Sequence, residues 1–317
     1  MPGASPELEV ERLVRDQLYG ERTEVRAAPM RGPKRRPDPL GRLVGGRYRL
    51  LERVGVGGMA TVYRAQDERL KRDVAVKVIA DWLVRDAVAV RRFRREAQLS
   101  AGLAHPNIVA ILDAGGEPRE YIVMELVSGV HAGTMLHGRR RLTPEQAVHV
   151  LAQVSDALAY AHDRDVVHHD VSPRNILIRQ PDRVAKLADF GLASSTLDDP
   201  ASQSASVSGT PGYVAPEILR GAAASPRSDL YSLGVVAYRL LAGRPRPQLV
   251  DSQATAPQAT SVPRITPLAE ARPDLSRNLA EAVQRAMAHD PDARPDSVAE
   301  FRAQLLDGRP TALRSTA

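Results

Sequence analysis

The sequence predicts an α+β protein with two lobes, in which a small β-rich lobe precedes a larger α-helical lobe. Three observations support this division. Between about residues 47 and 79 the apolar residues alternate with a period of two, which is typical of strands. From residue 143 onward they recur every three or four residues, which is typical of helices. The 317 residues are 43% hydrophobic and 26% charged, which suits one large or two modest globular domains.

The composition excludes several classes of protein. The chain has no cysteine, which excludes a disulfide scaffold, a thiolate nucleophile and a Cys-ligated zinc or iron–sulfur site. Its 44 basic and 38 acidic side chains give a net charge of only +6, so we expect no nucleic-acid partner. No apolar run is long enough for a membrane span, and the N-terminal residues lack the apolar core of a signal peptide. We therefore expect a cytoplasmic protein.

The two ends of the chain are expected to lie outside the folded lobes. Residues 1–46 are rich in charge, proline and glycine, and they cannot bury enough apolar surface to order themselves, so we expect a disordered basic tail. Within it, residues 6–19 place four apolar side chains on one helical face, which favours a frayed helix over a docking helix. Residues 307–317 are expected to form a short C-terminal tail.

The small lobe is predicted to begin with strands that a glycine turn interrupts. Val74, Val76 and Val78 point to one face of a strand, and Lys77 points to the other. The turn at residues 55–60 suits either an ordinary hairpin or a loop whose backbone N–H groups approach phosphate. A strand follows it, which excludes a Walker A loop and a Rossmann unit. The other predicted elements of this lobe are a basic helix and two short strands, at residues 83–103, 108–112 and 121–126.

The large lobe is predicted to consist of helices. Thr143-Pro144-Glu145-Gln146 matches a capping box with proline at the first helical position. A second buried helix is expected from about Asp229 to Leu241, and a helical pair from about Leu275 to Leu306. The polar, proline-rich residues 248–273 favour a surface loop with at most one short helix. A crevice between two such lobes is a common place for a ligand.

Several polar residues are of the kinds that phosphate and metal chemistry requires. Lys77 lies within an apolar strand, and burying its charge is costly unless it is paired, so we expect Glu96 on the following helix to be its partner. Asp170, Asn175 and Asp189 carry hard oxygen donors, which suit Mg²⁺. Taken singly, each of these three would more often be a turn or cap residue.

Together and in this order, the residues resemble the protein kinases, and specifically the bacterial Ser/Thr kinases of the eukaryotic type. The resemblance covers about residues 47–306, which it divides into an N-lobe (47–127) and a C-lobe (128–306). The matching motifs are Val54-Gly55-Val56-Gly57-Gly58-Met59-Ala60-Thr61-Val62-Tyr63, Val74-Ala75-Val76-Lys77, Glu96, Asp170 with Asn175, Asp189-Phe190-Gly191 and Ala215-Pro216-Glu217.

The resemblance implies an enzyme that transfers the γ-phosphate of ATP to Ser or Thr hydroxyls of proteins, itself included, with Mg²⁺ or alternatively Mn²⁺. It implies that Asp170 orients the substrate hydroxyl and accepts its proton, and that Lys77, held by Glu96, contacts the α- and β-phosphates. Asn175 and Asp189 would hold the metal. The implied ATP-binding residues are Val54, Gly55, Val56, Gly57, Gly58, Met59, Ala60, Thr61, Val62, Ala75, Lys77, Glu96, Met124, Glu125 and Val127. Asp229 and a Glu217–Arg294 pair are expected to be structural.

Two residues of the catalytic loop depart from the family pattern. His169 replaces the usual Arg before Asp170, and it lacks the permanent charge and the bidentate fork of a guanidinium. Ser172 replaces the Lys that usually neutralises charge on the transferring phosphoryl group. We predict that Arg174, which stands where many tyrosine kinases place an Arg, supplies that charge. The alternative is a pseudokinase, an ATP-binding regulatory scaffold with a drifted catalytic loop.

The expected partners follow from the same resemblance. Residues 209–213, Gly-Thr-Pro-Gly-Tyr, resemble the substrate-docking segment of Ser/Thr kinases, so protein Ser and Thr residues are the expected acceptors, and Thr210 is expected to bond Asp170. A homodimer through the N-lobe or the tail is a further candidate assembly.

Overall fold

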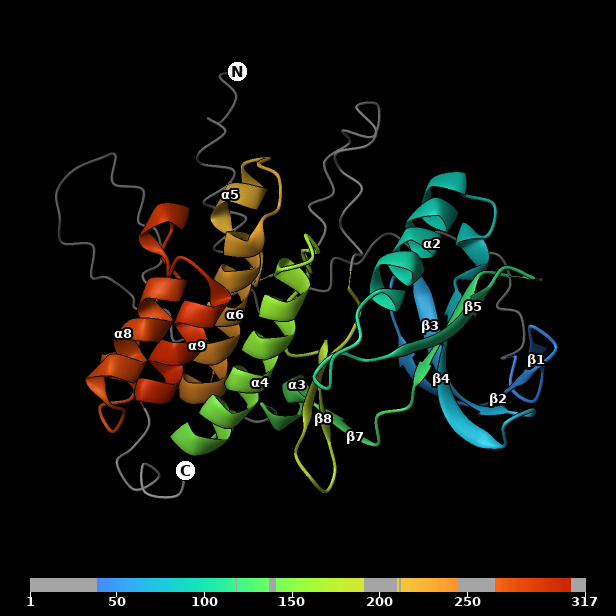
Figure 1. Ribbon diagram of the computed structural model, residues 1–317, viewed down its shortest axis with the longest axis horizontal. Helices are drawn as coiled ribbons and strands as arrows, with labels where there is room; N and C mark the ends of the chain where they lie inside the picture. Colours follow the sequence, from blue (N-terminus) through green and yellow to red (C-terminus); the bar gives the residue numbers. More distant parts are fainter. Residues whose placement is uncertain are drawn as a thin grey trace, which may run out of the picture.

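The computed structural model describes residues 39–117, 119–136, 141–190, 210, 212–243 and 266–308. The N-lobe is an antiparallel sheet of six strands in the order β1-β2-β3-β4-β6-β5, packed against one helix, α2 (Figure 1). The strands are β1 (Leu43–Val44), β2 (Tyr48–Val56), β3 (Ala60–Asp67), β4 (Arg72–Ile79), β5 (Ile111–Gly115) and β6 (Tyr121–Glu125), and α2 spans Ala87–Ala101.

The alternation predicted around residue 77 is present in β4, and both faces of this strand are buried. Val74, Val76 and Val78 pack into one cluster of the sheet. On the opposite face, Ile79 packs beneath α2 with Phe93. Because both faces are covered, Lys77 lies in the interior between the sheet and α2.

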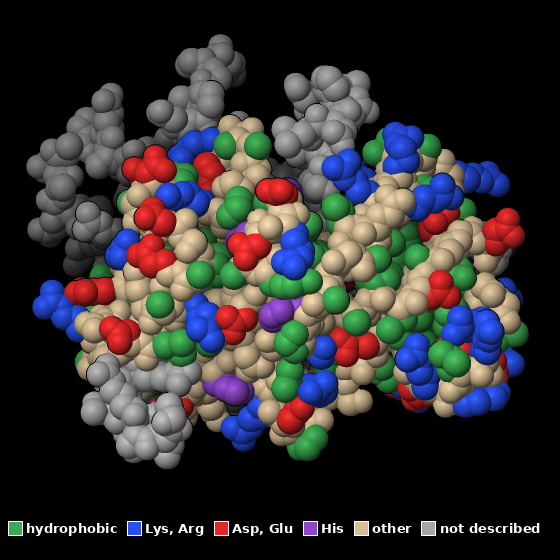
Figure 2. Space-filling model, in the orientation of Figure 1, with side chains coloured by type: hydrophobic (Ala, Val, Ile, Leu, Met, Phe, Trp, Pro, Cys, Tyr) green, Lys and Arg blue, Asp and Glu red, His purple; other side chains and the backbone are tan. Residues whose placement is uncertain are grey.

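The helix predicted at residues 83–103 is shorter than expected at both ends. Asp86 caps its N-terminus by accepting hydrogen bonds from the backbone N–H groups of Val88 and Ala89, so α2 begins at Ala87. The buried face of α2 includes Phe93 and Glu96, whereas its outward face is basic. Figure 2 shows Lys and Arg side chains gathered over this helix.

The sheet begins earlier along the chain than the predicted lobe boundary at residue 47. Leu43–Val44 (β1) pairs with Arg49 and Tyr48 of β2. The left-handed backbone of Gly45 and Gly46 closes this hairpin. Residues 43–46, which the sequence analysis assigned to the disordered tail, are therefore part of the sheet, because strand pairing satisfies their backbone groups. Residues 1–38 and 309–317 lie outside the described part.

The C-lobe contains two central helices, α4 (Pro144–His162) and α6 (Pro226–Ala242). The predicted capping box is present at Thr143 and Gln146. A second one, at Ser225 and Ser228, starts α6 three residues before the predicted position. The other elements of this lobe are α3 (Ala132–Met135), α5 (Pro216–Leu219), α7 (Leu268–Ala271), α8 (Arg277–Ala286), η4 (Pro291–Ala293), α9 (Val298–Asp307) and a small sheet of β7 (Gly129–His131), β8 (Ile176–Arg179) and β9 (Ala185–Leu187).

The strand predicted at residues 108–112 is divided between the two lobes. Only Ile111 and Leu112 of this stretch belong to β5. Ile108 instead forms an isolated parallel bridge with Leu187 of β9, and Val109 donates its backbone N–H to the Leu187 carbonyl at 2.9 Å. These bonds join the N-lobe to the C-lobe sheet that carries Asn175 and Asp189 at its ends. None of the helices in the described ranges is long and apolar enough to cross a bilayer.

Candidate active site

A buried ion pair connects β4 to α2, as the sequence predicts. Lys77 Nζ donates to Glu96 Oε1 at 2.5 Å, and both side chains are buried. Lys77 also donates to Asp189 Oδ1 at 3.0 Å, so three elements meet at this ammonium group. Burial lowers the pKa of Lys77, but the charges of Asp189 and Glu96 raise it further than burial lowers it. The site therefore holds a fixed positive charge at neutral pH.

Glu96 gives the site a pH dependence. Burial raises the pKa of Glu96 to about 7, with the charge of Asp189 adding to this rise and that of Lys77 opposing it. Protonation below this pH removes the ion pair that holds Lys77. Because this pKa is higher in the folded state than in the unfolded chain, ionised Glu96 destabilises the fold at neutral pH. That destabilisation disappears as the pH falls from 7 towards the pKa that Glu96 has in the unfolded chain. Acidification in this range should therefore raise the stability of the fold while it lowers the activity.

We expect kcat/KM for ATP to decrease below about pH 7 while the protein stays folded. A Glu96→Gln variant should have lower activity at neutral pH and should lack this acid limb, because Gln cannot titrate. Phosphoryl transfer measured between about pH 5.5 and 8.5, with circular dichroism at each pH, checks both points. An identical acid limb in Glu96→Gln would assign the titration to another group.

The catalytic loop is held in place by a fully buried carboxylate. Asp229, on α6, accepts the backbone N–H groups of His168 at 2.7 Å and His169 at 2.9 Å. His162 contacts the same carboxylate at 2.9 Å. Burial raises the pKa of Asp229, but these partners lower it further, so it remains ionised. Asp229 thus fixes His169, whose backbone is left-handed, directly before Asp170.

Asp170 is oriented by two donors from different parts of the chain. Its Oδ1 accepts the backbone N–H of Thr210 at 2.7 Å, and its Oδ2 accepts the side-chain amide of Asn175 at 3.0 Å. The bond between Thr210 and Asp170 expected from the sequence is therefore present, and it is made by the Thr210 backbone. Asp170 itself is only partly buried. Its carboxylate is thus held in a fixed orientation and is accessible to a substrate hydroxyl.

Asn175 and Asp189 lie at the adjoining ends of the paired strands β8 and β9. The backbone carbonyl of Asn175 accepts the N–H of Ala188, the residue before Asp189, at 2.8 Å. The amide nitrogen of Asn175 donates to Asp170, and neither of these bonds uses its side-chain oxygen. An amide oxygen and a carboxylate are hard donors, and Mg²⁺ commonly takes one or two such protein ligands together with phosphate oxygens and water. The residues present therefore fit a Mg²⁺ ion bound together with a nucleotide.

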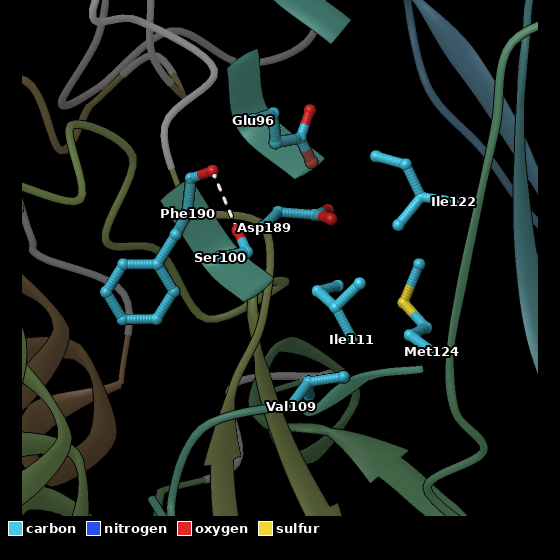
Figure 3. A pocket seen from close by; sticks show the side chains of 8 residues that line it. All are labelled: Glu96, Ser100, Val109, Ile111, Ile122, Met124, Asp189 and Phe190. Atoms are coloured by element: carbon cyan, nitrogen blue, oxygen red, sulfur yellow. Dashed lines mark hydrogen bonds between the residues drawn. The ribbon is translucent and has the colours of Figure 1, made fainter. Parts of the chain in front are cut away.

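An apolar cluster lies beside these polar groups. Ala75 and Met124 pack with Val109 and Ala188, and the partly buried Val62 and Val127 join the same cluster. It is the expected place for an adenine ring. Behind it is a small pocket lined by Glu96, Ser100, Val109, Ile111, Ile122, Met124, Asp189 and Phe190. Figure 3 shows the carboxylates of Glu96 and Asp189 on one side of this pocket and Ile122 and Met124 on the other.

The glycine turn is a hairpin between β2 and β3, closed by the N–H of Gly57 donating to the Ala60 carbonyl at 2.9 Å. A Cβ on Gly58 would meet no atom within 4 Å. Among the described residues, therefore, no packing requires a glycine there, which is consistent with a backbone left free for close approach of a ligand. Val54 and Val56 on this hairpin are well exposed.

Sequence analysis missed one ion pair at this site. Lys186, on β9, donates to Glu125 Oε1 at 2.6 Å and to the Ile108 carbonyl. The same Glu125 oxygen accepts the backbone N–H of Ala110. The Glu125 side chain therefore ties the N-lobe to β9. The scarcity of lysine, with only four in the chain, was the signal that could have identified Lys186.

Ser172 and Arg174, of which the second is predicted to supply the charge missing at the first, lie in different environments. Ser172 is fully buried, and its hydroxyl has no hydrogen-bond partner among the residues that the structure describes. Arg174 is exposed, and its charge acts on the Tyr213 phenol. Burial lowers the pKa of His169, which is therefore neutral at pH 7. Gly191, Gly209 and Pro211 lie outside the described residues.

A model of the protein kinase domain matches residues 48–305. The chain belongs to the protein kinase family. The kinase is 42% identical over 268 residues to serine/threonine-protein kinase PknB of Mycobacterium tuberculosis, an alignment covering 82% of this chain and 42% of that protein. It is 41% identical over 206 residues to PrkC of Bacillus subtilis, covering 65% and 32%. The kinase thus spans less than half the length of these curated relatives.

Solved structures give the same result for the fold. The crystal structure of the Mycobacterium tuberculosis PknI kinase domain is 31% identical to this kinase, with a TM-score of 0.65, and the alignment covers 84% of this chain and 97% of that one. The predicted fold, with a β-rich N-lobe and a helical C-lobe, is confirmed, as is the resemblance to the bacterial Ser/Thr kinases.

Proposed function

We propose that this chain is an active serine/threonine protein kinase that transfers the γ-phosphate of ATP to protein hydroxyls. The observation that carries the proposal is the joint geometry of Lys77, Glu96, Asp189 and Asp170. The Lys77–Glu96 pair is formed, and Asp170 is oriented by Thr210 and Asn175. A pseudokinase, which transfers no phosphate, would not need both arrangements.

The nucleotide is proposed to lie between the lobes. The hairpin at residues 54–62 would cover its phosphates, the cluster containing Ala75 and Met124 would hold the adenine, and the backbone at residues 125–127 would bond its edge. Lys77 would contact the α- and β-phosphates. Mg²⁺ on Asn175 and Asp189, with Mn²⁺ as an alternative, would neutralise the phosphate charge.

Asp170 is proposed to prepare the substrate. Its carboxylate accepts a hydrogen bond from the Ser or Thr hydroxyl and takes the proton as that oxygen bonds to the γ-phosphorus. The bond between the γ-phosphorus and the bridging oxygen breaks, and ADP leaves with that oxygen. Thr210, bonded to Asp170 through its backbone, belongs to the segment on which the acceptor would rest.

Arg174 is proposed to supply the positive charge that Ser172 lacks. An Arg174→Ala variant should lower kcat about 100-fold with little change in KM for ATP, because the interaction develops with charge in the transition state. Steady-state phosphorylation of a Ser or Thr peptide measures both constants. Arg69→Ala, a change at an exposed N-lobe position, is the control. Unchanged turnover in Arg174→Ala would contradict the assignment.

The alternative function is a pseudokinase, and His169 and Ser172 are the residues that favour it. Transfer of labelled γ-phosphate from ATP with Mg²⁺, to the protein itself and to a general protein substrate, separates the two functions. We expect label on Ser and Thr residues. ATP binding without any transfer would establish the pseudokinase.

The partners are proposed on chemical grounds. Protein substrates follow from the kinase fold and from the segment containing Thr210 and Tyr213. ATP and Mg²⁺ are abundant in the cytoplasm, so the catalytic lobes are proposed to work there. A homodimer through the N-lobe or through residues 1–46 remains a proposal, which measurement of the molar mass in solution would test.

A further inference from the structure

The path of the acceptor polypeptide past the site rests on the proposed function. The acceptor hydroxyl must reach Asp170, whose carboxylate is bonded to Thr210. Tyr213 donates its backbone N–H to the Thr210 carbonyl at 3.1 Å, so it lies one turn from that contact. A polypeptide that presents a hydroxyl to Asp170 therefore passes close to Tyr213.

The Tyr213 phenol is held by an arginine of α6. Arg239 Nη1 donates to Tyr213 Oη at 2.5 Å, and the guanidinium lies 5.3 Å from the centre of the phenol ring. The backbone of Tyr213 is anchored to the same helix, because its carbonyl accepts the Ser232 hydroxyl at 2.7 Å. Arg239 is thus held in a fixed, partly exposed position against Tyr213, which lies two hydrogen bonds along from Asp170.

Arg239 differs from the other arginines that are at least partly buried in this lobe. Arg294 is paired with Glu217, Arg272 with Asp274, and Arg227 with Asp296. Within the ranges that the structure describes, Arg239 has no carboxylate partner, and its Nε is buried without a hydrogen-bond acceptor. Among the described residues, therefore, no carboxylate compensates the charge of this guanidinium.

A second cation, Arg174, follows Asp170 by four residues in the same loop. The charges of Arg239 and of the exposed Arg174 both act on the Tyr213 phenol. Burial nevertheless raises the pKa of Tyr213, so the phenol stays neutral and offsets neither charge. Two cations beside one phosphoacceptor position attract anions and repel lysine or arginine side chains.

We propose that Arg239, together with Arg174, forms a basic subsite beside Asp170 that selects substrates with a negatively charged side chain close to the acceptor Ser or Thr. Asp and Glu carboxylates supply that charge, as does a residue that is already phosphorylated. Both are anions, which a guanidinium attracts and can bind through charge-assisted hydrogen bonds.

The test compares peptides with a single Thr acceptor that differ at one position at a time. Each flanking position carries Glu, Ala, Lys or phosphoserine in turn. We expect kcat/KM to be about tenfold higher with Glu than with Lys at the selected position, and the difference to shrink as salt is added. Arg239→Glu should reverse this ratio and Arg239→Gln should abolish it, whereas Arg69→Glu, which adds the same charge change on the N-lobe, should leave it unchanged. A higher rate with phosphoserine than with Glu would identify a preference for primed substrates.

The outcomes separate the specificity from the activity. Equal rates for all peptides in the wild type, or an Arg239→Glu variant with the wild-type ratio, would overturn the subsite. If no peptide is phosphorylated, the proposed function is wrong. The binding affinities of labelled Glu and Lys peptides for the protein then test the subsite independently of activity. Tighter binding of the Glu peptide, lost in Arg239→Glu, would support the subsite even then, and equal affinities would reject it.

Discussion

Asp170→Asn is expected to lower phosphoryl transfer by about 10²- to 10⁴-fold, because the amide cannot accept the proton of the substrate hydroxyl. The carboxylate receives its two hydrogen bonds from Thr210 and Asn175. An amide oxygen can still accept one of them, so the loop should keep its conformation. ATP affinity should change little, since Lys77 and Asp189 are intact. Transfer of labelled γ-phosphate and binding of a fluorescent ATP analogue measure the two effects separately.

Asp165 offers a matched control for this substitution. It lies five residues earlier, is exposed, and has a left-handed backbone that Asn adopts readily. Asp165→Asn should therefore keep full activity and stability. If Asp170→Asn retained wild-type turnover, the assignment of Asp170 as the base would be wrong, and phosphoryl transfer would have to depend on another group.

Arg294→Met is expected to destabilise the C-lobe by about 3 to 5 kcal/mol, because it removes a fully buried guanidinium and leaves the partly buried Glu217 carboxylate without its partner. The Arg294 side chain is fully buried and donates to both carboxylate oxygens of Glu217 at 2.7 Å. It also donates to the carbonyls of Ala288 and Arg227 and lies 4.9 Å from the Tyr231 ring. This one guanidinium therefore joins α5, α6 and the segment before α9.

Thermal unfolding should show the loss as a decrease in Tm of about 6 to 20 °C. Arg277→Met is the control, since Arg277 forms only an exposed pair with Glu281 on α8 and should leave Tm essentially unchanged. Adding Glu217→Gln to Arg294→Met should recover part of the loss, because the unpaired, partly buried charge is then removed. A decrease no larger than that of Arg277→Met would show that the pair does not hold the lobe together.

Local sequence patterns predicted most of the fold. The alternation in β4 placed Lys77 in the interior, and the cost of an unpaired buried charge made Glu96 its expected partner. The capping box at Thr143 located the start of α4 to the residue. The extra strand β1 was missed, because its two residues carry too little pattern to be separated from the polar sequence before them.

The sequence by itself determined the family, the two lobes and the identity of the residues around the site, because periodicity and motif spacing are local properties of the chain. Only the tertiary structure decided which distant groups meet. Thr210 reaches Asp170 across 40 residues, and Lys186 reaches Glu125 across 61. No sequence pattern singled out Arg239, because only the packing of α6 places it against Tyr213. Periodicity fixes the face on which a side chain lies, but the packing of separate elements fixes what that face meets, and the charge beside Asp170 depends on that packing.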